Sequence, residues 1–162
     1  DFLTQELTEI TNSQAKRMTM AEAMKEADVF IGVSAPGVLT SEMVKSMKDH
    51  PIVFAMANPE PEIPYQEAID AGVAVMGTGR SDYPNQINNV LAFPGLFRGA
   101  LDVKARKISE GMKLAAAYGL ASLVDETELS PTYVIPNALD PRVSDVVAKA
   151  VAKKAIEEGL AR

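Results

Sequence analysis

Three continuous apolar runs, each followed by small residues and a turn, constrain the fold of this 162-residue chain more than any other feature. They read DVFIGVSAPG, PIVFAMANPEPEIP and VAVMGTG and begin at residues 28, 51 and 73. A strand buried on both faces of a parallel sheet has this pattern, whereas a strand with one wet face alternates polar and apolar residues. We therefore expect strands near 28–33, 52–57 and 73–77 in one parallel sheet.

Helical segments separate these runs. Thr19 and Glu22 have the spacing of a capping box, and Thr40 is a candidate N-cap for the segment SEMVKSMKDH. The third segment, YQEAIDAG, ends in Gly72, which suits a left-handed helix C-terminus. Short helices alternating with apolar strands are typical of an α/β protein with a doubly wound, Rossmann-like parallel sheet.

The pattern after residue 80 is helical throughout. The segment INNVLAFPGLFRGALDV is apolar at helical spacing, although Pro94 and Gly95 interrupt it, and the Ala-rich ISEGMKLAAAYGLASLV follows. Asp140 and Pro141 are expected as N-cap and first residue of a last helix that ends near Gly159. The chain therefore divides into an α/β part over about 1–80 and a helical part over about 81–162.

Composition excludes several classes of function. The net charge is −6 and the lysines are scattered among acids, which argues against a nucleic-acid partner. There is no Cys, so no thiolate nucleophile or thiolate metal site is available. No apolar run approaches the length of a membrane span, and we expect a cytoplasmic protein without a membrane partner.

Small residues and amides follow the expected strands, where an open α/β sheet binds its ligands. Asn58 follows the second strand, and Asn88 and Asn89 lie in the longer segment after the third. An Asn side chain donates and accepts hydrogen bonds without carrying charge, so these three could orient a carboxylate, hydroxyl or carboxamide in one pocket. The alternative is structural, because Asn also caps helices and fills turns.

Two charged residues after the third strand leave two interpretations open. Arg80 and Asp82 lie close to the expected ligand edge of the sheet. They could contact a ligand phosphate, or they could simply pair with each other.

Five blocks in a fixed order resemble one known family. They are ADVFIGVSAPGVLT, IVFAMANPEPEI, GTGRSDYPNQINNVLAFPGLFRGALDV, MKLAAAYGLASLV and VIPNALDPRV. Together they resemble the C-terminal, dinucleotide-binding part of malic enzyme, of the short type common in bacteria and archaea, from about Ile10 to Arg162. The resemblance implies oxidative decarboxylation of L-malate to pyruvate and CO₂ with NAD or NADP, a requirement for Mg²⁺ or Mn²⁺, and a homo-oligomer.

The resemblance also implies roles for particular residues. In the family, the Asn of the ANP loop and the Asn pair before the FPG helix reach the malate carboxylate and the nicotinamide end of the cofactor. The corresponding substrate-binding residues here are Asn58, Asn88 and Asn89. The corresponding cofactor-binding residues are Gly32, Val33, Ser34, Ala35, Asn58 and Asn89.

The family's general acid Tyr, general base Lys, metal ligands and glycine-rich GxGxxG loop lie upstream of the matching segments. We therefore expect a partial dinucleotide-binding domain that holds later strands only, carries no catalytic residue or metal ligand, and is inactive alone. Such a piece should leave an apolar edge strand uncovered. The alternative is a non-catalytic α/β module that binds a nucleotide or a partner chain.

Overall fold

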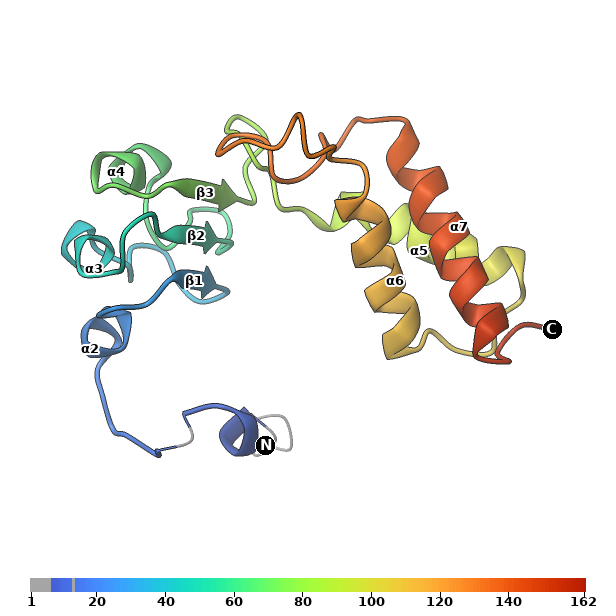
Figure 1. Cartoon of the computed structure of the whole chain (residues 1–162), viewed down its shortest axis with the longest axis horizontal. Coiled ribbons are helices and arrows are strands. Elements are labelled where there is room, and N and C mark those ends of the chain that lie inside the picture. The colour runs from blue at the N-terminus through green and yellow to red at the C-terminus, as the bar shows by residue number, and fades with distance from the viewer. Residues whose placement is uncertain (1–6, 13) are drawn as a thin grey trace.

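The computed structural model describes residues 7–12 and 14–162, which form an α/β part followed by a group of helices (Figure 1). No helix in these ranges is long and apolar enough to cross a lipid bilayer. The α/β part contains α2 (Met20–Met24), β1 (Val29–Gly32), α3 (Ser41–Lys45), β2 (Ile52–Ala55), α4 (Tyr65–Asp70) and β3 (Val75–Thr78). The helical part contains η1 (Asn89–Leu91), α5 (Phe93–Asp102), α6 (Glu110–Ala121) and α7 (Arg142–Glu157).

The three strands form a parallel sheet in the order β1-β2-β3, which confirms the α/β, Rossmann-like prediction. Gly32 pairs with Ala55, and Ala55 pairs with Thr78, so all three strands end at the same edge. The third strand begins two residues later than expected, a shift that is ordinary for boundaries predicted from sequence.

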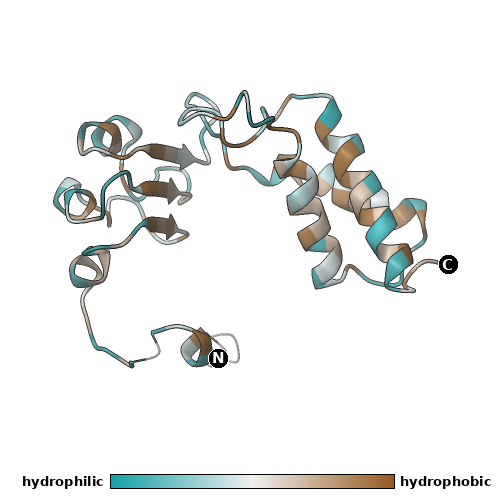
Figure 2. Ribbon diagram, in the orientation of Figure 1, coloured by the Kyte–Doolittle hydropathy of each residue, from teal (hydrophilic) through white to brown (hydrophobic). Residues whose placement is uncertain are grey.

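Helices cover one face of this sheet. The strand order advances in one direction, so right-handed crossovers place α3 and α4 on the same face. The core there includes Met24, Leu39, Val44, Met47, Val53, Ala55, Ile63, Ala68, Val73 and Met76. The residues of the strands are mostly apolar (Figure 2), yet Val29 and Ile31 of β1 are 46% and 64% exposed. The expectation that both faces are buried is therefore wrong for β1. This strand also lies at one end of the sheet, and its outer edge pairs with no strand of the described residues.

The helices α5, α6 and α7 pack around a second hydrophobic core. Its buried members are Leu91, Leu96, Ala100, Met112, Ala116, Leu123, Val143, Val147, Val151 and Ala155. Gly95 and Gly99 lie where α5 contacts α7, and a Cβ on either would overlap atoms of α7. Pro94 lies in the first turn of α5 and does not interrupt that helix, because the first turn needs no hydrogen bond from its nitrogen.

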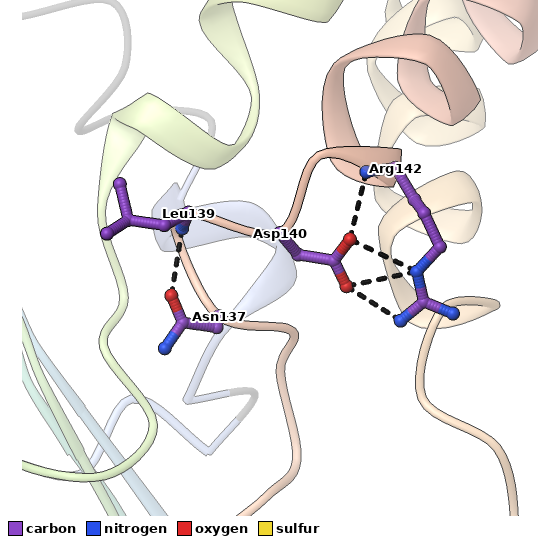
Figure 3. Close-up of polar contacts among 4 residues, drawn as sticks. All are labelled: Asn137, Leu139, Asp140 and Arg142. Atoms are coloured by element: carbon purple, nitrogen blue, oxygen red, sulfur yellow. Dashed lines mark hydrogen bonds and ion pairs between the residues drawn. The ribbon is translucent and has the colours of Figure 1, made fainter.

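Side-chain caps begin several helices as the sequence predicts. Thr19 and Glu22 form the capping box at α2, and the Thr40 hydroxyl accepts a hydrogen bond from the Met43 amide at α3. Asp140 accepts from the backbone N–H of Arg142 at 2.9 Å and pairs with its guanidinium (Figure 3). The expected cap contact is therefore present, although α7 is assigned from Arg142, one residue later than expected.

Candidate active site

A cavity of about 430 Å³ lies beside the carboxyl ends of the strands. These ends point toward α5, α6 and α7, so the cavity is bounded by both parts of the chain (Figure 1). Its lining residues are Val33, Met56, Asn58, Ile87, Asn88, Asn89, Leu91, Ala92, Leu120 and Ile135. The structure thus brings together the three amides that the sequence predicted, in a mostly apolar cavity of ligand-binding size.

Two of the three amides are available to a ligand. Asn58 and Asn89 are exposed, and neither side chain has a hydrogen-bond partner within the described residues. The Asn58 side chain lies against Gly79, where a Cβ would be 3.3 Å from Oδ1. The small residue after β3 therefore gives room to the amide that follows β2.

The third amide, Asn88, also has a structural role. Its Oδ1 accepts a hydrogen bond from the backbone N–H of Val90 at 3.0 Å and so caps η1. The structural interpretation is thus correct for this oxygen. The amide nitrogen of Asn88 retains its capacity to donate into the cavity that the residue lines.

Of the two neighbouring amides, Asn85 holds the loop in place and Gln86 makes one long contact. Asn85 is buried, donates to the carbonyl oxygens of Met76 and Pro131, and accepts from the Val134 amide at 2.9 Å. Gln86 donates to the Gly79 carbonyl at 3.4 Å. The four amides therefore serve two purposes: Asn85 anchors the loop through three hydrogen bonds, and Asn88 and Asn89 line the cavity.

Of the four predicted cofactor-loop residues, Gly32 ends β1, and Val33, Ser34 and Ala35 follow it directly. Gly32 is buried, whereas Val33, Ser34 and Ala35 are exposed, and Val33 lines the cavity. A Cβ on residue 32 would lie 2.5 Å from the carboxyl carbon of Glu62. Glycine is therefore needed here by the packing of the protein itself, besides any contact with a ligand.

Glu62 is a buried polar residue beside the site that the sequence did not reveal. It is fully buried, and its carboxylate accepts hydrogen bonds from the Ser34 amide (2.8 Å), the Ser34 hydroxyl (3.1 Å) and the Ala57 amide (3.0 Å). Burial alone would raise the pKa of Glu62, but the hydrogen bonds from the Ser34 and Ala57 amides outweigh burial and hold it below its usual value. The side chain is therefore an ionised carboxylate at neutral pH.

Charged and aromatic side chains fix the loop after β3. Arg80 makes two hydrogen bonds to Asp82, at 2.9 and 2.7 Å, and lies 5.6 Å from the centre of the Tyr83 ring. The Tyr83 ring stacks on Tyr65, with centroids 4.4 Å apart and planes 6° apart. Asp82 raises the pKa of Arg80 further above its ordinary value, so the cation is permanent. Of the two interpretations of this pair, the structure shows mutual pairing.

A divalent-metal site is not found in residues 7–12 and 14–162. No group of three or more His, Asp or Glu side chains there is placed to hold a metal ion. The described residues therefore do not fit the ion that the resemblance implies.

A comparison with models of protein families identifies the family of this chain. A family model described as malic enzyme, NAD binding domain, matches residues 2–156. The chain belongs to this family. The malic enzyme NAD-binding domain thus accounts for nearly the whole sequence, as the five motif blocks predicted.

Known malic enzymes are similar in sequence and in structure. The bifunctional malic/malolactic enzyme of Bacillus subtilis is 59% identical over 157 residues, covering 97% of this chain and 38% of that protein. The NAD-dependent malic enzyme of Geobacillus stearothermophilus is 55% identical, covering 98% of this chain and 33% of that protein. The crystal structure of malic enzyme from Pyrococcus horikoshii matches with a TM-score of 0.86 and 48% identity, over 93% of this chain and 35% of that one. The chain thus spans between a third and two fifths of the length of these relatives.

Proposed function

We propose that a protein containing this malic enzyme domain oxidises L-malate and decarboxylates the product to pyruvate and CO₂, with NAD or NADP as oxidant. The observation that supports this most is the convergence of Asn58, Asn88 and Asn89 on one cavity at the carboxyl edge of a parallel sheet. Ligands of open α/β sheets bind at this edge. Family membership supplies the reaction that such a cavity would serve.

The loop after β1 fits the dinucleotide. Val33, Ser34 and Ala35 are small or medium-sized and exposed, so a flat ligand can approach this loop, whereas Gly32 is buried against Glu62. When bound, NAD or NADP supplies the acceptor for the hydride that leaves the malate C2 carbon. Val33 belongs both to this loop and to the cavity lining, which supports a nicotinamide end next to the amides.

Asn58 and Asn89 orient malate in this proposal. Malate has two carboxylates and one hydroxyl, and an amide can donate to the former and donate to or accept from the latter. Because both amides are neutral, they hold the substrate without changing the charge of the reacting centre. Their backbones are held by hydrogen-bonded strand ends and by η1, so little rearrangement is needed on binding.

Proton transfer and metal binding are assigned to residues outside the described ranges. The described residues do not fit a divalent-metal site, and their cavity is lined by amide and apolar side chains without an acid or base. We therefore infer that the domain contributes positioning of substrate and cofactor, while the remainder of the protein contributes the general acid, the general base and the metal ligands.

A spectrophotometric assay of the intact protein tests the proposal. We expect malate-dependent formation of NADH or NADPH with an equal amount of pyruvate, abolished by removal of Mg²⁺ and Mn²⁺ with a chelator. The polypeptide of 162 residues alone is expected to be inactive. Dinucleotide binding by an intact protein that forms no pyruvate from malate would contradict the proposal and favour the non-catalytic nucleotide-binding module.

A further inference from the structure

Glu62 connects the two loops that bound the candidate site. One carboxylate oxygen accepts from the amide and hydroxyl of Ser34, which follows β1, and the other accepts from the amide of Ala57, which follows β2. Ser34 is adjacent to Val33, and Ala57 is adjacent to Asn58. A single side chain therefore fixes the backbone next to two residues that line the cavity.

The surroundings of Glu62 show that this connection is built into the packing. The side chain is 0% exposed, and the carboxyl group occupies the space that a side chain on residue 32 would need. Backbone hydrogen bonds add to it, because the Leu39 amide donates to the Glu62 carbonyl and the Gly37 amide donates to that of Pro61. A buried carboxylate that accepts hydrogen bonds from two neighbouring loops holds those loops at a fixed separation.

We propose that Glu62 is a positioning residue for the reaction. It holds the cofactor loop (residues 32–35) and the Asn58 amide at a fixed position relative to each other. This inference rests on the proposed function, because the loops are those assigned to the dinucleotide and to malate. Glu62 itself does not line the cavity and acts through the backbone amides of Ser34 and Ala57.

The test compares two Glu→Gln variants of the intact protein. Glu62→Gln keeps the shape of the side chain but presents an amide N–H₂ to a backbone donor, so one loop loses its partner. We expect kcat/KM for malate to fall by at least about tenfold, with KM raised for both malate and the dinucleotide. Glu60→Gln makes the same change two residues earlier, on an exposed side chain 3.6 Å from Arg80, and should leave the kinetics unchanged.

The kinetic constants separate positioning from stability. They are measured at a temperature where circular dichroism shows each variant to be fully folded. A Glu62→Gln enzyme that melts earlier but keeps wild-type kcat and both KM values overturns the inference. If Glu62→Gln does not fold, Glu62→Asp replaces it, since this change keeps the negative charge but shortens the side chain, so that the carboxylate can no longer reach the donors of both loops. A severalfold lower kcat/KM then supports the inference, and wild-type kinetics overturn it.

Equilibrium binding of the dinucleotide distinguishes this inference from the proposed function. If the wild-type protein does not act on malate but binds NAD or NADP, the proposed reaction fails, and the inference is decided by binding alone. A dissociation constant raised at least about tenfold in Glu62→Gln supports the loop-positioning role. An unchanged dissociation constant, or a wild-type protein that binds neither dinucleotide, overturns it.

Discussion

Replacement of Asn89 by alanine in the intact protein is expected to lower kcat/KM for malate by about 100-fold, through both a higher KM and a lower kcat. The Asn89 side chain is exposed in the cavity and has no partner within the described residues, so its removal leaves no buried donor behind. What is lost is a hydrogen bond that orients the substrate, and misorientation lowers the rate of the chemical step as well as binding. Steady-state kinetics at saturating dinucleotide measure this.

Two further variants control for charge and for local structure. Asn89→Asp keeps the size but repels the malate carboxylates, so KM should rise further than in Asn89→Ala. Gln86→Ala removes an amide three residues earlier whose contact is the Gly79 carbonyl, and it should change kcat/KM less than about threefold. Unchanged malate kinetics in Asn89→Ala would show that this amide does not bind the substrate.

A second large effect is expected at the contact between α5 and α7. Gly99→Ala places a Cβ against the carbonyl oxygen and backbone of Ala148, which cannot move without displacing α7. Alanine favours a helix over glycine by about 1 kcal/mol, but overpacking typically costs about 1–3 kcal/mol. Because the obstacle is backbone, we expect the overpacking to prevail and the melting temperature of the intact protein to fall by several degrees.

Gly119→Ala is the matched control for this prediction. Gly119 is also buried in a helix, α6, but a Cβ there meets its nearest atom, the Ala150 Cβ, at an ordinary 3.4 Å. The helix preference should then dominate, and this variant should melt at the wild-type temperature or above it. Equal melting temperatures for the two variants would contradict the described packing of α5 on α7.

The sequence predicted the features that depend on local pattern. The apolar runs predicted the three parallel strands, because an apolar run bounded by turns can be recognised as a strand from the local sequence alone. Thr19, Thr40 and Gly72 cap or end their helices because these preferences act within a few residues. The sequence also predicted that Asn58, Asn88 and Asn89 share one pocket, because the carboxyl ends of parallel strands lie at one edge of the sheet.

The features that the sequence did not reveal depend on contacts between distant segments. Glu62 lies in the proline-rich PEPEIP loop, where an acid is usually solvated, and its burial depends on donors 5 and 28 residues away. The sequence does not distinguish Asn85 from the other amides of its segment, because its role depends on hydrogen bonds to Pro131 and Val134, which are distant in the sequence. The exposure of Ile31 follows from a strand order that places the crossover helices on one face, which composition cannot show.

In the proposed function, the cavity lined by Val33, Asn58, Asn88 and Asn89 binds malate beside the nicotinamide. A crystal structure of the intact protein with NAD or NADP and an unreactive dicarboxylate tests this most directly. We expect a carboxylate within hydrogen-bonding distance of Asn58 or Asn89, with the nicotinamide carboxamide in the same cavity and the dinucleotide along residues 32–35. A dicarboxylate bound elsewhere while these amides face solvent would contradict it.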